Sequence, residues 1–166
     1  MHDELTKIDI EKMKAELAER HAKIPAQKAE VKRTREFGDL SENDEYRSAK
    51  RELNRNRSRM RYLEKMIETA VVISTDSAEG EVGLFDRVEI YYPEMDKTRT
   101  VRIVTTLRND VFNGIISKES PFGRALLGAR VGETVTVVGN DGNSYPVKIV
   151  SITKGEDDPD IPISTY

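Results

Sequence analysis

The stretch that decides the fold is Phe37-Gly38-Asp39-Leu40-Ser41-Glu42-Asn43-Asp44-Glu45-Tyr46, which places four carboxylates between positions 39 and 45 of a 166-residue chain. Before it, apolar residues recur every seven positions, at Ile10, Leu17, Ile24 and Val31. After it, a seam with steps of three and four runs through Tyr46, Ala49, Leu53, Asn56, Met60, Leu63, Ile67 and Ala70. Both patterns predict helices, and so short a connection predicts that they run antiparallel with the acidic stretch at their tip.

The two predicted helices extend over residues 10–35 and 42–70. Thr6 and Asp9 are candidate caps for the first helix, and Pro25 inside it predicts a kink near residues 21–25. Gly38 suits the position just after a helix, where a left-handed conformation is common. Asp39 or Ser41 is expected to cap the second helix.

After a linker at residues 76–80 the apolar period changes from helical to two. Strands are predicted at 82–92, 99–106, 111–117, 133–138 and 144–152, with a short helix that starts at Ser120-Pro121 and closes at Gly128. We therefore expect an α+β protein, with an antiparallel helical arm over 1–75 and a small antiparallel β domain over 81–155. The domain lacks Trp and its aromatic residues are scattered, so the aromatic-lined pocket of a prolyl isomerase is not expected. Residues 156–166 are expected to form a disordered tail.

The composition, 37% apolar and 34% charged, suits a thin arm better than one compact ball. No apolar run is long enough for a membrane span, no signal peptide is evident and no cysteine is present, so a cytoplasmic protein is expected. The net charge of −3 divides into +2 over residues 1–75 and −5 over residues 76–166. From Arg47 to Lys65, eight basic residues face only two acidic ones, Glu52 and Glu64.

Two interpretations of the tip acids remain open from spacing alone. Helix capping and the helix dipole account for one or two of Asp39, Glu42, Asp44 and Glu45, and this simpler interpretation is favoured. Four neighbouring carboxylates repel one another, and they are also suited to share Mg²⁺, which usually takes one or two protein carboxylates. The basic stripe is likewise either a solvated helix face or an RNA contact, and the small number of acidic residues within it favours RNA.

The run Arg35-Glu36-Phe37-Gly38-Asp39-Leu40-Ser41-Glu42-Asn43, followed by Glu45-Tyr46, resembles the tip signature of the bacterial GreA/GreB transcript-cleavage factors, and the GreA branch most closely. Further matches are Leu5-Thr6, Pro25, Val71-Val72-Ile73, the segment Ser120–Gly128, and Val131-Gly132-Glu133. The resemblance covers about residues 5–153. The chain departs from the family at residues 50–57, which replace a run that more usually contains Gln, Gly and Phe.

The resemblance implies a coiled-coil arm and an FKBP-like globular domain that holds the rim of the RNA polymerase secondary channel. Asp39 and Glu42 would help to hold Mg²⁺ jointly with polymerase and orient the attacking water. Polymerase itself, and not this protein, would then cleave backtracked RNA.

The remaining expected sites are tip support at Gly38, Ser41, Asn43, Glu45 and Tyr46, contact with the RNA 3′ end at Arg35, Arg47, Lys50, Arg51 and Arg55, and polymerase contact at Ser120 and Pro121. Of the RNA contacts, Arg35 and Lys50 resemble the family's basic patch, and the others are expected from the basic stripe. A monomer without a membrane partner is expected. One alternative is an inhibitor that occupies the polymerase channel without promoting cleavage, since Asp44 adds an acid to the tip. A coiled-coil RNA-binding or chaperone adaptor is the other.

Overall fold

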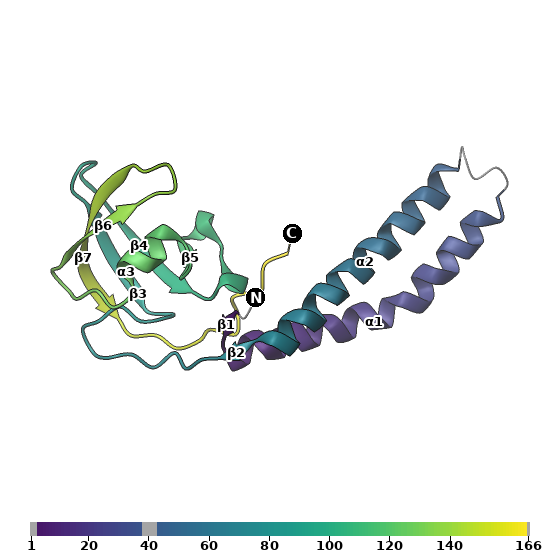
Figure 1. The fold of residues 1–166 in the computed structure, drawn as a ribbon, viewed down its shortest axis with the longest axis horizontal. Coiled ribbons are helices and arrows are strands. Elements are labelled where there is room, and N and C mark those ends of the chain that lie inside the picture. The colour runs from purple at the N-terminus through teal and green to yellow at the C-terminus, as the bar shows by residue number, and fades with distance from the viewer. Residues whose placement is uncertain (1–2, 38–42, 166) are drawn as a thin grey trace. The chain divides into compact units, whose positions relative to one another are not determined.

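The computed structural model describes residues 3–37 and 43–165, which form two compact units. One is a helical unit over Ile10–Ala70, and the other is a globular unit that combines Asp3–Asp9 with the chain from Val71 onward (Figure 1). The sequence placed all of residues 1–75 in the arm. The N-terminal segment instead joins the globular unit, because β1 (Glu4–Leu5) pairs in parallel with β2 (Val71–Val72).

The helical unit consists of α1 (Lys7–Arg35) and α2 (Asp44–Thr69), which run antiparallel as predicted. Contacts between the helices show the direction, because Glu16 pairs with Arg59 whereas the carbonyl of Thr34 accepts from Asn43, near the other end of both helices. Helix α1 continues through Pro25 without interruption and bends along its length (Figure 1). The helix therefore tolerates the loss of the one backbone N–H that proline lacks, and it does not end there.

The predicted apolar seam is present in α2, where Ala49, Leu53, Met60 and Leu63 are buried. On α1, Met13 is fully buried, but the predicted residues Ile10, Leu17, Ile24 and Val31 are only half-buried. A helix covered by a single neighbour keeps part of its apolar stripe in contact with water. The seam is therefore thin, and polar contacts complete it.

The globular unit is built on a curled five-stranded sheet in the order β5-β4-β3-β7-β6. The strands are β3 (Arg87–Tyr92), β4 (Lys97–Val104), β5 (Ile115–Ser117), β6 (Thr134–Val138) and β7 (Ser144–Thr153). All neighbouring pairs are antiparallel except β4 and β5, which are parallel, so the expected all-antiparallel sheet is wrong at this edge. Two short 3₁₀ helices, η1 (Thr106–Arg108) and η2 (Val111–Asn113), make the crossover, and η2 occupies part of a predicted strand.

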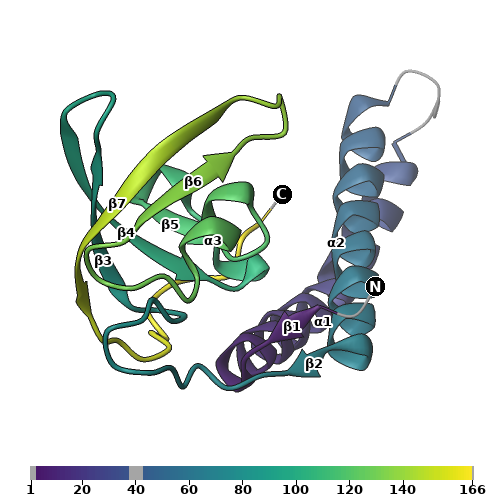
Figure 2. The same cartoon turned by 60° about the vertical axis from the view of Figure 1, so that its left-hand side comes forward.

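The core of the globular unit lies on the inner face of this sheet. Alternate residues such as Val88, Ile90, Val101, Ile103 and Ile149 are at most 1% exposed, as the period of two predicted. Helix α3 (Pro121–Leu126) adds Phe122 and Leu126 to the same core and lies against the curled sheet (Figure 2).

The C-terminal segment is not the disordered tail that the sequence predicted. Ile161 is 7% exposed and belongs to the core, and the backbone N–H and side chain of Ser164 donate to the carbonyls of Leu107 and Asn109. The acid-rich composition suggested disorder, but Asp157 pairs with the buried Arg108 and Asp158 pairs with Arg102, which local composition does not reveal.

Candidate nucleic-acid interface

The acidic stretch is described only at its edges. Four predicted tip residues, Gly38, Asp39, Ser41 and Glu42, lie outside the described residues. The described flanks are Arg35 and Phe37 on the side of α1, and the segment Asn43–Tyr46 at the start of α2. The site is therefore built here from these flanks and from the faces of the helices that lead away from them.

Asn43 ties the ends of the two helices together. Its Oδ1 accepts a hydrogen bond from the backbone N–H of Tyr46 at 3.0 Å, which makes Asn43 the N-cap of α2. Its Nδ2 donates to the carbonyl of Thr34 at 2.6 Å, in the last turn of α1. The prediction that Asp39 or Ser41 caps α2 is therefore wrong, because Asn caps as well as Asp and can also donate to the neighbouring helix.

Asp44 and Glu45 form the exposed acidic first turn of α2, where the helix dipole favours negative charge. The Asp44 side chain is 95% exposed and lies 4.0 Å from the nearest nitrogen of Arg47. Throughout 3–37 and 43–165, no three His, Cys, Asp or Glu side chains group closely enough to hold a metal ion. A Mg²⁺ role at the tip therefore depends on Asp39 and Glu42 together with ligands from elsewhere.

A shallow basic groove of about 520 Å³ lies on α2, next to this acidic turn. Its lining residues are Tyr46, Arg47, Lys50, Arg51, Asn54, Arg55 and Ser58. The structure thus gathers four of the five predicted RNA-contacting residues on one surface. Arg35 is exposed near the end of α1 and does not line the groove.

Helical spacing explains why these residues share a face. Positions 47, 51, 55 and 50, 54, 58 follow one another at intervals of four, and the buried seam residues occupy the other side of α2. The Lys50 ammonium lies 5.8 Å from the centre of the Tyr46 ring, a distance that permits a cation–π contact. An aromatic ring and several cations on one open surface can contact both the bases and the phosphates of a single strand.

Arg59 departs from the basic stripe, since it is buried in the seam rather than exposed. It donates through Nε and Nη2 to the two carboxylate oxygens of Glu16, at 2.9 and 3.1 Å, and Arg20 donates to the same carboxylate. Burial alone would raise the pKa of Glu16, but the hydrogen bonds from Arg59 and Arg20 outweigh it and hold this pKa below its ordinary value of 4.5.

Asn56, the polar break in the seam, sits in the same layer. Its Nδ2 donates to the carbonyl of Arg20 and to Oε1 of Gln27, and its Oδ1 accepts from Arg20. Arg20, Gln27 and Asn56 are polar residues in or beside the seam, and they satisfy one another by hydrogen bonding. This polar layer holds α2, and with it the basic groove, in register with α1.

Ser120 and Pro121, the predicted polymerase contacts, have a complete structural role as well. The Ser120 hydroxyl accepts from the backbone N–H of Gly123 at 3.0 Å and caps α3, as predicted, and Pro121 occupies the first helical position. A Cβ atom on Gly123 would lie 2.2 Å from the carbonyl oxygen of Ser117, so only glycine permits this approach of α3 to β5.

Two aromatic rings lie next to each other on the globular unit. The rings of Tyr92 and Tyr145 lie 6.2 Å apart and line a pocket of about 620 Å³ together with Met95 and Pro146. Burial raises the pKa of both phenols, so the tyrosines stay neutral at physiological pH. The strand pattern placed each tyrosine at the end of a strand but gave no sign that β3 and β7 would be neighbours.

Comparison with known proteins places both units in one family. The profile described as "Transcription elongation factor, N-terminal" matches residues 4–72, and the profile "Transcription elongation factor, GreA/GreB, C-term" matches residues 76–154. None of the described helices is long and apolar enough to cross a membrane.

Individual relatives agree with the profiles. Transcription elongation factor GreA of Thermosipho africanus is 43% identical over 135 residues, which cover 80% of this chain and 85% of that protein. The factor of the same name from Thermotoga neapolitana is 41% identical over 151 residues, 90% of this chain and 96% of its own. Among solved structures, GreA factor homolog 1 of Thermus thermophilus is 26% identical with a TM-score of 0.42, covering 93% of this chain and all of its own.

Proposed function

This chain belongs to the GreA/GreB family of transcription elongation factors, and from this premise we propose its function. We propose that it binds bacterial RNA polymerase and stimulates the cleavage of backtracked RNA by polymerase itself. In this proposal the helical unit enters the secondary channel, and residues 38–42 reach the catalytic centre. The protein acts as a monomer in the cytoplasm and catalyses no reaction alone.

The observation that carries the proposal is the sequence of charges along α2. The helix opens with the exposed acids Asp44 and Glu45, which follow Asp39 and Glu42 in the sequence, and continues into the basic groove. A helix that only had to remain in solution would intersperse both signs of charge, which gives favourable pairs four residues apart. Separation of the signs instead suits a strand of RNA whose phosphates lie along the groove and whose reacting end lies at the acids.

Asp39 and Glu42 are the proposed site residues at the reacting end. Two carboxylates are what Mg²⁺ usually takes from a protein, the other positions being filled by water and phosphate oxygens, so this donor set fits a metal ion shared with polymerase. When bound, the ion would stabilise charge on the oxygens of the reacting phosphodiester. The two carboxylates would raise the occupancy of the ion. One of them would also accept a hydrogen bond from the attacking water and orient it.

Asn43 and the basic groove have supporting roles in this proposal. The bonds of Asn43 to Thr34 and Tyr46 join the last turn of α1 to the first turn of α2. Arg47, Lys50, Arg51 and Arg55 contact phosphates of the backtracked RNA without reading its sequence. The globular unit supplies binding to the channel rim, with Ser120 and Pro121 as proposed contacts.

The second candidate function, a channel-binding inhibitor, is favoured by the full exposure of Asp44. An additional carboxylate at the tip would bind a metal ion in a geometry that blocks the reaction. A transcript-cleavage assay on stalled, backtracked complexes with labelled RNA separates the two. The proposal predicts that added protein shortens the transcript from its 3′ end and restores elongation, and that polymerase alone does so far more slowly.

Slower synthesis without shortened transcripts would favour the inhibitor. Asp44→Asn then provides the matched variant, because it removes the additional acid and leaves Asp39 and Glu42 in place. Under the proposed function this variant keeps its cleavage activity.

A further inference from the structure

We propose that the C-terminal segment 157–164 is a peptide clasp, which fills a site in the globular unit and thereby holds β1 and the first turn of α1 in that unit. The segment lies beyond residue 154, where the family profile ends. The inference rests on contacts within the globular unit and is independent of the function proposed above.

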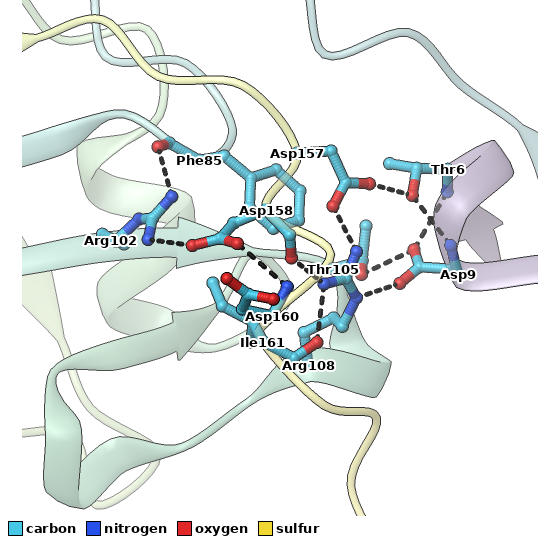
Figure 3. Close-up of polar contacts among 10 residues, drawn as sticks. All are labelled: Thr6, Asp9, Phe85, Arg102, Thr105, Arg108, Asp157, Asp158, Asp160 and Ile161. Carbon is cyan, nitrogen blue, oxygen red and sulfur yellow. Dashed lines mark hydrogen bonds and ion pairs between the residues drawn. The ribbon is translucent and has the colours of Figure 1, made fainter. Parts of the chain in front are cut away.

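Arg108 is the centre of the site and is completely buried. Its Nε donates to Oδ1 of Asp9 at 2.8 Å, and its Nη2 pairs with the carboxylate of Asp157. Its Nη1 donates to the backbone carbonyls of Asp158 and Ile161, at 2.7 and 2.8 Å (Figure 3). One guanidinium therefore binds the start of α1 on one side and the C-terminal segment on the other.

Thr6 joins the same two segments directly. Its hydroxyl accepts from the backbone N–H of Asp9 at 3.1 Å, which caps α1, and donates to the carboxylate of Asp157, 151 residues away in the sequence. Asp9 completes the cap, since its Oδ2 accepts from the backbone N–H of Thr6 at 2.9 Å and from the hydroxyl of Thr105 at 2.7 Å. The carboxylate of Asp157 thus contacts both the buried arginine and the residue that caps the helix.

The remaining contacts of the segment show that it is recognised by shape as well as charge. Ile161 inserts into the hydrophobic core, and Asp158 pairs with Arg102 at 3.4 Å. Arg108 binds two backbone carbonyls of the segment, those of Asp158 and Ile161. The side chain of Ser164 donates to the carbonyl of Asn109 at 3.0 Å. A segment that was merely attracted to a basic surface would not bury a branched apolar residue.

Asp157 links the C-terminal segment to residues 3–9 through its contacts with Arg108 and Thr6. Without Asp157, the buried Arg108 would keep only one carboxylate partner, and the Thr6 hydroxyl would lose its acceptor. Buried charges and donors that lose a partner are strongly destabilised, so the site would open to water. Strand β1 pairs with β2 over only two residues, so the contacts of Asp157 add to the burial of Leu5 and to the ion pair of Glu4 with Lys118 in holding the N-terminal segment.

The test is hydrogen–deuterium exchange, read by mass spectrometry, on the full-length protein and two matched variants. Asp157→Ala removes the carboxylate of the clasp. Asp160→Ala removes an exposed carboxylate three residues away. The backbone N–H of Asp160, which donates to Asp158, is kept in this variant. We expect residues 3–9 and 157–164 to exchange about tenfold faster or more in Asp157→Ala, and to remain as in the natural protein in Asp160→Ala.

Strand β3 serves as the internal control for folding and should stay protected in all three proteins. Equal exchange of residues 3–9 in the natural protein and in Asp157→Ala would overturn the proposal. So would loss of protection across β3 in that variant, because the segment would then be part of the global fold rather than a clasp. Polymerase is absent from the experiment, so its outcome is separate from that of the cleavage assay.

Discussion

A single side chain, Asn43, both begins α2 and binds the last turn of α1. We predict that Asn43→Ala lowers the free energy of unfolding of the helical unit by about 1 kcal/mol or more, since it removes an N-cap. Asn43→Asp is the matched variant, because an aspartate caps equally well but cannot donate to the carbonyl of Thr34. Denaturation followed by circular dichroism should place the stability of Asn43→Asp between those of the natural protein and Asn43→Ala. Equal stability of the natural protein and Asn43→Asp would show that the bridge to α1 contributes nothing.

The ionisation of Glu16 makes the stability of the helical unit depend on pH. Its pKa is lowered in the folded state, so its stabilising effect is complete above about pH 4.5 and is lost as the pH falls through the lowered value. Glu16→Gln should therefore destabilise the helical unit at pH 7 by about 1.5–3 kcal/mol, and the difference should shrink as the pH falls through the lowered pKa. Denaturation of both proteins across this pH range measures the difference. Glu30→Gln, which changes an exposed pair with Arg33, should have little effect throughout this range.

At this scale the sequence predicted which residues would be polar in the seam but not how they would pair. Asn56 was recognisable as a break because it occupied an apolar position of the heptad pattern. The cap of α2 was predicted wrongly, because several residues between 39 and 44 are chemically able to cap a helix. The choice of Asn43 depends on the carbonyl of Thr34, which reaches it only after the helices have packed.

The basic groove is a property of one element, α2, and its prediction concerns RNA. Replacing Arg51 and Arg55 with alanine should weaken binding to backtracked complexes most at low salt, because fewer counterions are released on binding. Loss of two phosphate contacts on a single strand should reduce the slope of log K against log salt by about 1.4. Binding measured over a series of salt concentrations gives this slope directly.

The control for the groove is the pair of substitutions Lys23→Ala and Lys28→Ala, which removes the same charge from the exposed side of α1. If both double variants lose affinity equally, net charge and not the groove determines binding. Unchanged affinity and slope in the Arg51 and Arg55 variant would show that this face of α2 is only solvated.

Elements were predicted best where their periodicity was long. The two helices and the strands β3, β4, β6 and β7 each have a run of alternating or heptad residues that tertiary packing had no reason to override. Residues 111–117 were assigned to one strand because they are apolar, yet only Ile115–Ser117 pairs with β4. The direction of that pairing depends on the 3₁₀ turns before it, and a short apolar run does not encode direction.

For the whole molecule, two separate cores predict two separate unfolding transitions. Leu53 lies in the seam of the helical unit and Ile90 in the core of the globular unit, and both are buried. Leu53→Ala should lower the stability of the helical unit alone, by about 2–3 kcal/mol, and Ile90→Ala that of the globular unit alone, by about 3–5 kcal/mol. Scanning calorimetry should resolve the two transitions. A single transition that both variants shift equally would contradict this prediction.

Composition and charge indicated a long helical part and a small β domain, but they did not predict how the chain ends are used. The N-terminal residues were assigned to the arm because they precede it, and the C-terminal residues were assigned to disorder because they are acidic. Besides the pairing of β1 with β2, both ends contact the buried Arg108, whose partners are far apart in the sequence. No local pattern marks such an arginine.

We propose that Asp39 and Glu42 take part in the chemistry and do not merely begin a helix, a role that Asn43 fills. The most direct measurement is the rate of stimulated RNA cleavage and the affinity for polymerase, for Asp39→Asn, Glu42→Gln and the control Asp44→Asn, over a series of Mg²⁺ concentrations. We predict that the first two variants cleave about a hundredfold more slowly, which corresponds to about 2.7 kcal/mol of transition-state stabilisation, with affinity retained and with partial recovery at high Mg²⁺. The control should cleave normally. Near-normal cleavage by both Asp39→Asn and Glu42→Gln would contradict the account and leave a protein that binds the channel without acting at the reacting phosphate.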